Sequence, residues 1–458
     1  RHVHGDHARD AGAAAHHHHA GGAMSIRSRE LMFLIPAGLL ATLGLAAAAS
    51  ARADDLVAGP WQTAVGVAMV FLVMHVTLRI RAPQADPYLL PVVALITGVG
   101  LVTLYRIDEG LARDQAIWVV VGALVFIAVL VFLPDHRVLE RYRYVIGAIA
   151  IGLLVATMVF GTEINGSRLW IQVGGGQTIQ LGELAKVLMV LFLAGYLRDK
   201  REVLAIPTNR RLGIPMPSVR HLGPLLLFWG AALAAVVVLN DFGTALLFFG
   251  VFLAMIYLAT GRAAYAGIGL GLFALGSVAI WAVVPRIGTR VDAWLDPFGD
   301  PQGKGYQMVQ SLYALADGGA VGPGFGKSAL VTASGQTRIP ALPTDFIFSA
   351  VANDLGYIGA VGVLLLFLLV VARGFAIATA ARDGFSKLLA GGLTAAIGLQ
   401  AFLIIGGVIR LVPLTGVTLP FMSYGGSSVV TNFGLIALLL VISHRSRQSL
   451  LEAVGDGR

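Results

Sequence analysis

The chain contains no cysteine and little charge, since Asp, Glu, Lys and Arg together make up 13% of its 458 residues. The absence of cysteine excludes disulfides, iron–sulfur clusters, thiolate metal sites and cysteine nucleophiles. An average soluble chain carries about twice this share of charged residues. Here 57% of the residues are hydrophobic, more than a compact soluble core hides without leaving adhesive patches on its surface. The composition therefore excludes a water-soluble enzyme and predicts a membrane protein.

Long apolar segments are the main feature of the sequence. Each is close to the ~20 residues that a helix needs to cross a bilayer. They lie at residues 31–49, 60–78, 88–105, 115–133, 144–160, 179–197, 222–239, 243–260, 264–284, 350–376, 388–409 and 424–443. These runs are too long and uninterrupted for barrel strands, and the 57 glycines suit helices that pack closely in lipid. We predict an all-α, polytopic membrane helical bundle with about 12 transmembrane helices.

The charge distribution predicts how the bundle lies in the membrane. With a cytoplasmic N-terminus most Lys and Arg fall on the inner side, as the positive-inside rule requires. The inner loop at 198–221 holds Arg198, Lys200, Arg201, Arg210, Arg211 and Arg220. Both termini are then cytoplasmic. The inner charges set the topology, with binding of acidic lipid or a partner as the alternative. The net charge of +8 does not by itself indicate a nucleic-acid ligand.

The chain divides into four predicted parts. Residues 1–23, rich in His, Ala and Gly, are expected to form a disordered leader. Two N-terminal transmembrane helices follow in residues 24–87, then a membrane core at 88–443 and a cytoplasmic tail at 444–458. The core contains one long outer connection, residues 285–345. Connections of this length are usually functional or disordered, and its amphipathic stretch Tyr306–Ala316 predicts a structured segment.

Glu183 and Lys186 lie within the sixth apolar segment. They are three residues apart, so they share one face of a helix and can pair. Ionisable residues at membrane depth cost several kcal/mol unless they are compensated, so they are functional candidates by default. A neutralising pair that only holds helices together is the alternative. The spacing leaves both interpretations open.

Two aspartates lie where apolar segments meet the outer surface. Asp241 stands in the short turn between the seventh and eighth segments, where a helix cap is the simplest interpretation and chemistry the alternative. Asp345 stands where the long outer connection meets the tenth segment. A carboxylate there can act as a general base towards a polar group whose lipid tail stays in the bilayer. The alternative is a carboxylate stabilised by the dipole of the helix that follows.

The outer face also offers cations and an unusual backbone segment. The cations are Arg290, Lys304, Lys327, Arg338 and Arg410, which suit a lipid-linked phosphate or pyrophosphate. The backbone segment runs from Arg410 to Ser428. Its Pro420, Ser423, Tyr424, Gly425, Gly426 and Ser427 are candidates either for an anion cradle or for a packing turn capped by Ser427. Together with Asp345 these groups indicate chemistry on a lipid-linked anion, although a lipid exporter needs similar charges.

These segments and their order resemble the SEDS (shape, elongation, division and sporulation) family of the RodA/FtsW type over about residues 88–443. The resemblance rests on five motifs: Gly166-Ser-Arg168-Leu-Trp170-Ile with Gln180-Leu-Gly-Glu183-Leu-Ala-Lys186; Asp241-Phe-Gly-Thr-Ala; Gly305-Tyr-Gln307 with Gln310-Ser311; Leu342-Pro-Thr344-Asp345-Phe-Ile-Phe; and Pro413-Leu-Thr-Gly-Val with Leu419-Pro420 and Ser423-Tyr424-Gly425-Gly426-Ser427-Ser. The family core has ten helices, so the first two helices here are additions. The chain departs from the family at Asn353-Asp354, where two glutamates are usual. The stretch Leu411–Gly416 leans towards a RodA-like elongation enzyme.

The resemblance implies a peptidoglycan glycosyltransferase that polymerises lipid II by inverting transfer at the outer face of a bacterial plasma membrane. It assigns the catalytic base to Asp345 and an intramembrane pair to Glu183 and Lys186. No tightly bound cofactor is expected, but a divalent cation, Mg²⁺ or Mn²⁺, is an option for the pyrophosphate. The implied partners are a class B penicillin-binding transpeptidase and other elongation or division proteins, not nucleic acid. The alternatives are a flippase or transporter of the lipid-linked precursor, and a structural scaffold.

Overall fold

The structure is a computed structural model that describes residues 25–51, 58–164, 167–173, 178–205, 209–211, 214–216, 219–283, 285–325, 330–332 and 336–455. Each predicted apolar segment coincides with a helix. These helices are α1 (Ile26–Ala51), α2 (Ala58–Arg81), α3 (Leu89–Ile107), α4 (Glu109–Phe132), α6 (Arg143–Phe160), α7 (Leu181–Ala205), α8 (Val219–Val238), α9 (Phe242–Thr260), α10 (Ala263–Val283), α13 (Ile347–Ala380), α14 (Gly384–Val408) and α15 (Gly426–Gly455). The prediction of an all-α helical bundle is confirmed.

The remaining elements are short. The helices are α5 (Val138–Arg141), α11 (Pro285–Leu295), the 3-10 turn η2 (Pro297–Gly299) and α12 (Tyr306–Asp317). The strands are β1 (Thr162–Ile164), β2 (Ser167–Gln172) and β3 (Thr178–Ile179) in one antiparallel sheet, and β4 (Asn209–Arg211) with β5 (Ile214–Met216) in another. In the first sheet Thr162 pairs with Trp170 and Ile171 with Ile179.

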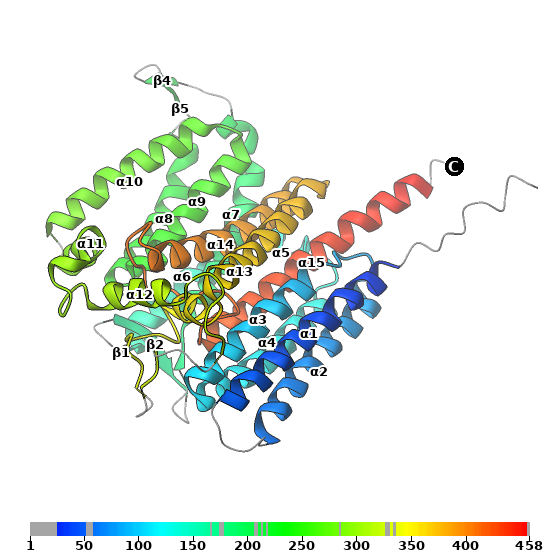
Figure 1. The fold of residues 1–458 in the computed structure, drawn as a ribbon. Coiled ribbons are helices and arrows are strands. Elements are labelled where there is room, and N and C mark those ends of the chain that lie inside the picture. Colours follow the sequence, from blue (N-terminus) through cyan, green and yellow to red (C-terminus); the bar gives the residue numbers. More distant parts are fainter. Residues whose placement is uncertain are drawn as a thin grey trace, which may run out of the picture.

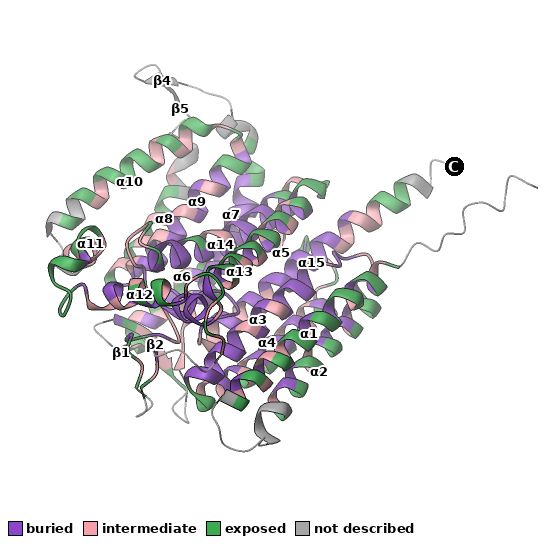
Figure 2. Ribbon diagram, in the orientation of Figure 1, coloured by how far each residue is buried: buried purple, intermediate pink, exposed green. Residues whose placement is uncertain are grey.

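Nine helices of the described chain are long and apolar enough to cross a membrane, namely α1, α2, α3, α4, α6, α9, α13, α14 and α15. The described apolar stretches of α8 and α10 are shorter, and α7 carries Glu183 and Lys186 in its first turns. Large apolar side chains such as Leu43 on α1 and Leu275 on α10 are exposed on the outside of the bundle (Figure 2). Bilayer lipid is the solvent that tolerates such a surface, so the chain is a multi-pass membrane protein.

The helices form one bundle in which the two N-terminal helices lie beside the core (Figure 1). α1 packs on α3 and α2 on α4, while α8, α9 and α10 form the opposite side. Small residues permit the close approach of α1 to α3. A Cβ added to Gly98 would lie 2.6 Å from the Cβ of Ala41, and one added to Gly44 would lie 2.9 Å from Cγ2 of Val102. Such small-residue contacts drive helix association in lipid, where the hydrophobic effect cannot.

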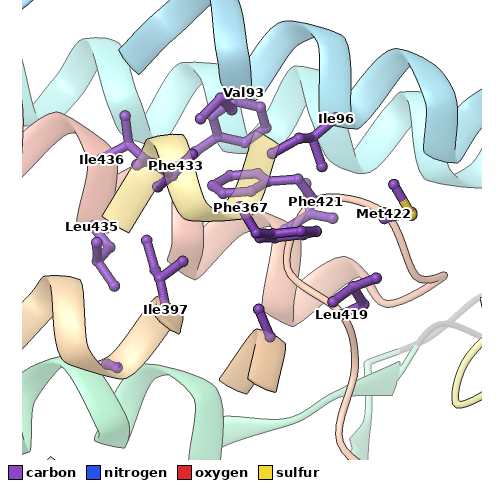
Figure 3. Packing of buried hydrophobic residues seen from close by; sticks show 14 of the residues in the cluster. Val93, Ile96, Phe367, Ile397, Leu419, Phe421, Met422, Phe433, Leu435 and Ile436 are labelled. Carbon is purple, nitrogen blue, oxygen red and sulfur yellow. The ribbon is translucent and has the colours of Figure 1, made fainter. Parts of the chain in front are cut away.

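The centre of the bundle is a close-packed apolar cluster between α3, α13, α14 and α15 (Figure 3). Phe421 and Phe433 meet edge to face with ring centroids 5.3 Å apart, which is a favoured aromatic geometry. Phe421 and Met422 belong to the segment between α14 and α15, and both are buried. The cluster therefore anchors that segment, which also contributes to the site described below.

The two ends of the bundle differ. We call the end at which α1 begins and α15 ends the terminal end, and the opposite one the site end (Figure 1). The connection predicted at 285–345 lies at the site end and contains α11, η2 and α12. α12 confirms the structured segment predicted at Tyr306–Ala316. β1 and β2 lie at the same end (Figure 1).

α13 is broken at Gly356, whose φ of 65° and ψ of −168° are not helical. Positive φ is a conformation that glycine adopts without steric cost. The backbone groups freed at the break bind the loop after α12: the amides of Tyr357 and Ile358 donate to the carbonyls of Gly319 and Ala320 at 2.9 and 3.1 Å. The part of α13 before the break is thus a separate short helix, held by that loop at the site end.

Candidate functional site

Asp345 lies in a tight turn just before α13. Its amide donates to the carbonyl of Ala341 at 2.9 Å. The segment before α15 clamps this turn from the other side: Ser423 Oγ donates to the carbonyl of Thr344 at 2.5 Å, and the Tyr424 amide donates to the carbonyl of Pro343 at 2.9 Å. Two motifs that are far apart in the sequence therefore build one rigid support for the carboxylate.

Asp345 as a residue is only partly exposed, and burial of its carboxyl raises the pKa from 3.8 to about 6. A hydrogen bond with the Thr344 side chain and the positive charge of Arg290 oppose that rise in the pKa. Asp345 does not cap α13, because the N-cap residue is Phe346 and no side chain bonds to the cap. The carboxyl thus stands outside the helix, with a pKa near neutrality as a general base requires.

Arg290, on α11, faces the same small space as Asp345. Its Nη1 donates to the carbonyl of Thr415 at 3.2 Å. Gly416 separates the two side chains: a Cβ added there would lie 3.5 Å from Oδ2 of Asp345 and 3.6 Å from Nη2 of Arg290. Gly416 also has a φ of 72°, which disfavours any other residue. The absence of a side chain at 416 leaves a space bordered by one carboxylate and one guanidinium.

An apolar groove of about 950 Å³ runs from this space between α8, α9, α10 and α11. Its lining includes Trp229, Phe249, Leu272 and Trp281, all apolar or aromatic side chains. Arg290 is the one charged residue among its described lining residues. Such a groove fits a long hydrocarbon chain whose anionic end reaches the guanidinium.

Asp241 caps α9, as the simpler interpretation of the sequence predicts. Its Oδ1 accepts a hydrogen bond from the amide of Thr244 at 3.0 Å. Burial raises the pKa of Asp241, and the bonds from Thr244 oppose this; Glu183 raises the pKa further and Arg290 lowers it. The cap therefore also lies within the electrostatic reach of the site.

Glu183 and Lys186 form the predicted pair inside the bundle. Lys186 Nζ donates to Glu183 Oε2 at 2.7 Å and to Gln400 Oε1 of α14 at 2.6 Å. Gln400 Nε2 in turn donates to the carbonyl of Thr418 at 2.8 Å. This chain of bonds joins α7, α14 and the segment before α15. The sequence-based predictions do not include Gln400, although a polar amide side chain within an otherwise apolar span is a signal of such a role.

Other predicted residues hold the site end together. Ser311 of α12 is buried and bonds to Ser349 Oγ of α13 at 2.8 Å. Ser427 Oγ accepts from the amide of Gln180 at 2.8 Å, so it ties α15 to the start of α7 instead of capping its own helix. The amide of Gly425 donates to Gln115 of α4 at 3.2 Å.

The predicted packing role of the segment is visible at its glycines. A Cβ added to Gly426 would meet the ring of Trp118 at 2.2 Å, so this glycine permits contact between α15 and α4. Pro420 is buried in the same segment, and Gln307 is half-buried on α12.

The predicted cations do not all face the same space. Arg410 is directed to the C-terminus of α11: its Nε donates to the carbonyl of Trp294 at 2.6 Å, and Nη2 bonds to Leu295. Lys304 lies at the surface 3.5 Å from Asp292. Arg338 is exposed, and Lys327 lies outside the described residues.

Arg168 and Trp170 lie on β2. Arg168 is exposed, with its Nε 3.7 Å from Glu163. The carbonyl of Trp170 accepts from the Thr162 hydroxyl at 2.9 Å. Ser167 Oγ links the same strand to the carbonyl of Asn240 at 3.4 Å, beside the cap of α9.

The turns of the site end carry unusual backbone conformations. Within the described residues, positive φ outside glycine occurs at Asn240, Ala341, Arg410 and Phe421, with values from 57° to 63°. Each costs on the order of 1–3 kcal/mol and persists only where the surroundings impose it. All four lie in turns that adjoin Asp241, Asp345, or the segment between α14 and α15. The structure therefore concentrates backbone strain at this end.

A second buried ion pair supports the short first part of α13. Arg106 Nη1 of α3 lies 3.1 Å from Asp354 Oδ2, and both side chains are buried. Asn353 Nδ2 donates to the carbonyl of Ala314 on α12 at 2.8 Å. Asn353 and Asp354 are the positions at which two glutamates are usual in the family that the motifs resemble. Their contacts position the helix that follows Asp345.

The fold and the site define a polytopic membrane protein with a guanidinium at the head of an apolar groove and a carboxylate beside that guanidinium. Comparison with known proteins then gives the family. The chain belongs to the FTSW/RODA/SPOVE family of cell cycle proteins, whose profile matches residues 84–448. The family predicted from the motifs is confirmed.

Two relatives illustrate this similarity. The chain is 40% identical to "Peptidoglycan glycosyltransferase RodA" of Mycobacterium tuberculosis (strain ATCC 25618 / H37Rv), over 93% of this chain and 92% of that protein. It is 32% identical to "Stage V sporulation protein E" of Bacillus subtilis (strain 168), over 80% of this chain and 99% of that protein. The name of the first relative carries the activity that the motif resemblance implies.

Solved structures show the same fold. A chain from a peptidoglycan synthase complex that coordinates polymerization and crosslinking superposes with a TM-score of 0.64 at 28% identity, covering 80% of this chain and 99% of that one. The rod shape determining protein RodA of Thermus thermophilus superposes with a TM-score of 0.56 at 27% identity, covering 79% and 97%.

Proposed function

We propose that this peptidoglycan glycosyltransferase polymerises lipid II, with Asp345 as the general base. The activity class follows from family membership and the relatives described above. The observation that carries the finer assignment is the space at Gly416, which Asp345 borders on one side and Arg290, a lining residue of the apolar groove, on the other. It offers a base, a cation and a channel for a lipid chain in one place.

The proposed reaction needs one base. The Asp345 carboxylate takes the proton of an acceptor sugar hydroxyl, whose oxygen then forms a bond to the anomeric carbon of the lipid-linked donor. The bond from that carbon to the pyrophosphate oxygen breaks, and the lipid pyrophosphate leaves. The configuration of the anomeric carbon is inverted. Arg290 stabilises the charge that develops on the leaving group, as a fixed cation in a site of low dielectric does.

The groove supports a polyprenyl donor. Its apolar lining between α8, α9 and α10 suits a hydrocarbon tail, while the only charge that its described residues present is at the site end. The same lining argues against a transporter, because carrying a pyrophosphate through the bundle needs polar partners along the way. Glu183 and Lys186 do not line the groove, and each bonds within the bundle.

A divalent cation fits this site as a companion of the substrate. Within the described residues no three His, Asp or Glu side chains gather in a way that could hold a metal. Mg²⁺ commonly keeps several waters and binds through one carboxylate and substrate phosphates. Asp345 is the carboxylate available for such binding, and the cation would supply charge neutralisation to the pyrophosphate.

The proposed setting is the bacterial plasma membrane, with the terminal end in the cytoplasm and the site end outside. The arginines near the terminal end support this orientation through the positive-inside rule. We also propose a class B penicillin-binding transpeptidase as partner, because a structural neighbour belongs to a complex that coordinates polymerization and crosslinking. Co-purification of the two chains would test that pairing.

A lipid II polymerisation assay on purified protein, with its partner present, tests the assignment. Asp345→Asn is expected to make no glycan while it keeps the elution profile and melting behaviour of a folded protein. Asp292→Asn is the matched control, since Asp292 is an exposed carboxylate on neighbouring α11. Polymer from Asp345→Asn at the level of wild type would refute the proposed base.

A further inference from the structure

A polar pocket of about 420 Å³ lies at the terminal end and shares no lining residue with the apolar groove. It is formed by α5, the start of α6 and the later part of α7. Its lining consists of Arg137, Glu140, Arg141, Arg143, Tyr144, Arg198 and Asp199. Four arginines line the pocket with two carboxylates, and a third carboxylate, Asp383, pairs with Arg137 at 3.2 Å from outside the lining, which leaves an excess of one positive charge.

The arginines are held in place by the surrounding structure. Arg143 Nη2 pairs with Asp199, its guanidinium lies 5.0 Å from the ring centre of Tyr144, and its side chain crosses α7 at Gly195, where a Cβ would lie 2.9 Å from its Cδ. Arg198 Nη1 lies 2.7 Å from Glu140. Side chains fixed in this way lose little freedom when they bind a ligand.

The pocket has hydrogen-bond donors that its own acids do not use. Arginine carries five N–H donors. The buried Nε of Arg143 has no hydrogen-bond partner within the described residues. Arg141 is exposed and forms no ion pair within them. The Nε of Arg143 is closed off from the pocket, so a ligand with several anionic oxygens would bind the exposed guanidinium of Arg141 and the accessible parts of the Arg143 and Arg198 guanidiniums.

The surface beside the pocket indicates which kind of anionic ligand the pocket fits. Tyr144, Val145 and Ile149 are exposed on α6. They follow one another along the helix axis, away from the pocket and towards the mid-depth of the membrane span. Val145 and Ile149 are four residues apart, so they lie on one face of the helix. A charged pocket continuous with an exposed apolar face at the end of a span matches a phospholipid, whose headgroup and acyl chains need both.

We propose that this pocket binds the phosphate headgroup of an anionic phospholipid of the inner leaflet. The guanidinium groups bind the phosphate oxygens, and the acyl chains lie along α6. Basic pockets between helices on the cytoplasmic side are known to hold such headgroups. Lipid binding at this pocket involves neither Asp345 nor the residues that line the apolar groove.

The proposal is tested by measuring the affinity of the full-length chain, in detergent micelles, for dansyl-phosphatidylglycerol. Binding is detected as fluorescence energy transfer from the tryptophans of the protein to the dansyl group. Arg141→Gln is expected to weaken binding about fivefold, as the loss of one hydrogen bond to the phosphate does. Arg143→Gln is expected to weaken it further. Arg81→Gln, at the exposed end of α2 on the same face, is the matched control and should leave binding unchanged.

Two further measurements separate the sources of phosphate. Dansyl-phosphatidylcholine should bind more weakly than the anionic lipid, and inorganic phosphate should not displace the bound lipid at comparable concentration. Equal affinity of the two Arg→Gln pocket variants, the control and wild type would overturn the site. Saturable binding of inorganic phosphate without any preference between the two lipids would overturn the lipid assignment. Because Arg141 is exposed, its substitution tests the site even if Arg143→Gln does not fold.

Discussion

Replacing Asp345 by asparagine should abolish activity and at the same time stabilise the protein. Burial raises the pKa of Asp345 from 3.8 to about 6, so the folded protein holds the proton more tightly than the unfolded chain. At about 1.4 kcal/mol per pKa unit the ionised carboxylate costs up to about 3 kcal/mol. Partial exposure of the side chain reduces this to roughly 1–2 kcal/mol. Asparagine has the same shape and no charge, so it avoids that cost.

The size of this stabilisation depends on pH. Below the unfolded pKa, near 4, both states hold the proton and the carboxyl costs nothing. The cost grows between about pH 4 and pH 6, and it is complete above the folded pKa of about 6. The melting temperature of Asp345→Asn should therefore exceed that of wild type by roughly 1–2 °C at neutral pH and match it near pH 4.

Differential scanning fluorimetry in detergent at several pH values measures this difference directly. The wild-type polymerisation rate should rise with pH through a midpoint near 6, because the base acts as the carboxylate. A variant that is inactive and less stable than wild type at neutral pH would show that Asp345 serves the structure. That result would refute the claim that the ionised carboxylate of Asp345 destabilises the folded protein and is kept for catalysis.

Three further changes test other parts of the site. Arg290→Gln should lower the polymerisation rate by at least about tenfold, and it should move the midpoint of the pH profile upward, because a cation that lowers the pKa of the base is lost. Ser277→Trp should fill the groove and raise KM for a long-chain donor more than for a short-chain one, whereas Leu275→Trp, on the exposed face of α10, should leave both unchanged. Lys186→Met should cost about 3–5 kcal/mol of stability by leaving the carboxylate of Glu183 buried without its partner, and adding Glu183→Gln should restore part of the melting temperature.

The membrane spans could be predicted from the sequence because the bilayer imposes a simple rule on backbone and side chains alike. The rule does not describe breaks within a helix. The segment predicted at 350–376 belongs to a helix that begins at Ile347 and is interrupted at Gly356. That interruption depends on carbonyls supplied by Gly319 and Ala320 in a different segment. No local pattern in the sequence contains this information.

The candidate site could be predicted in its residue types more than in its arrangement. Scarce charge singled out Asp345 and the Glu183–Lys186 pair. The proximity of Asp345 to Arg290 depends on how the long connection folds, so the sequence presented Arg290 as one of several equivalent cations. In the structure Arg410, from the same set, binds the carbonyls of α11 and orients that helix. It thereby positions the helix that carries Arg290 instead of facing the space at Gly416.

The two N-terminal helices are joined to the core by buried charge as well as by apolar packing. His75 Nδ1 of α2 lies 2.6 Å from Glu30 Oε1 of α1, and Arg27 of α1 bonds to the carbonyl of Ala85. The next residue, Asp86, accepts from Arg373 Nε of α13 at 3.1 Å, and it lies 3.5 Å from Arg447 of α15.

These groups lie in a row from α1 and α2, through the connection between α2 and α3, to α13 and α15. Breaking a buried ion pair by removal of one partner costs about 3–5 kcal/mol. Such a cost applies to Asp86, whose partners lie on α13 and α15, whereas the ion pairs of Glu30 lie within α1 and α2. Separation of α1 and α2 from the core would break the bond from Arg27 to the carbonyl of Ala85 and would open the packing of α1 on α3 and of α2 on α4. We therefore expect the N-terminal pair to stay packed on the rest of the bundle, although the family profile begins only at residue 84.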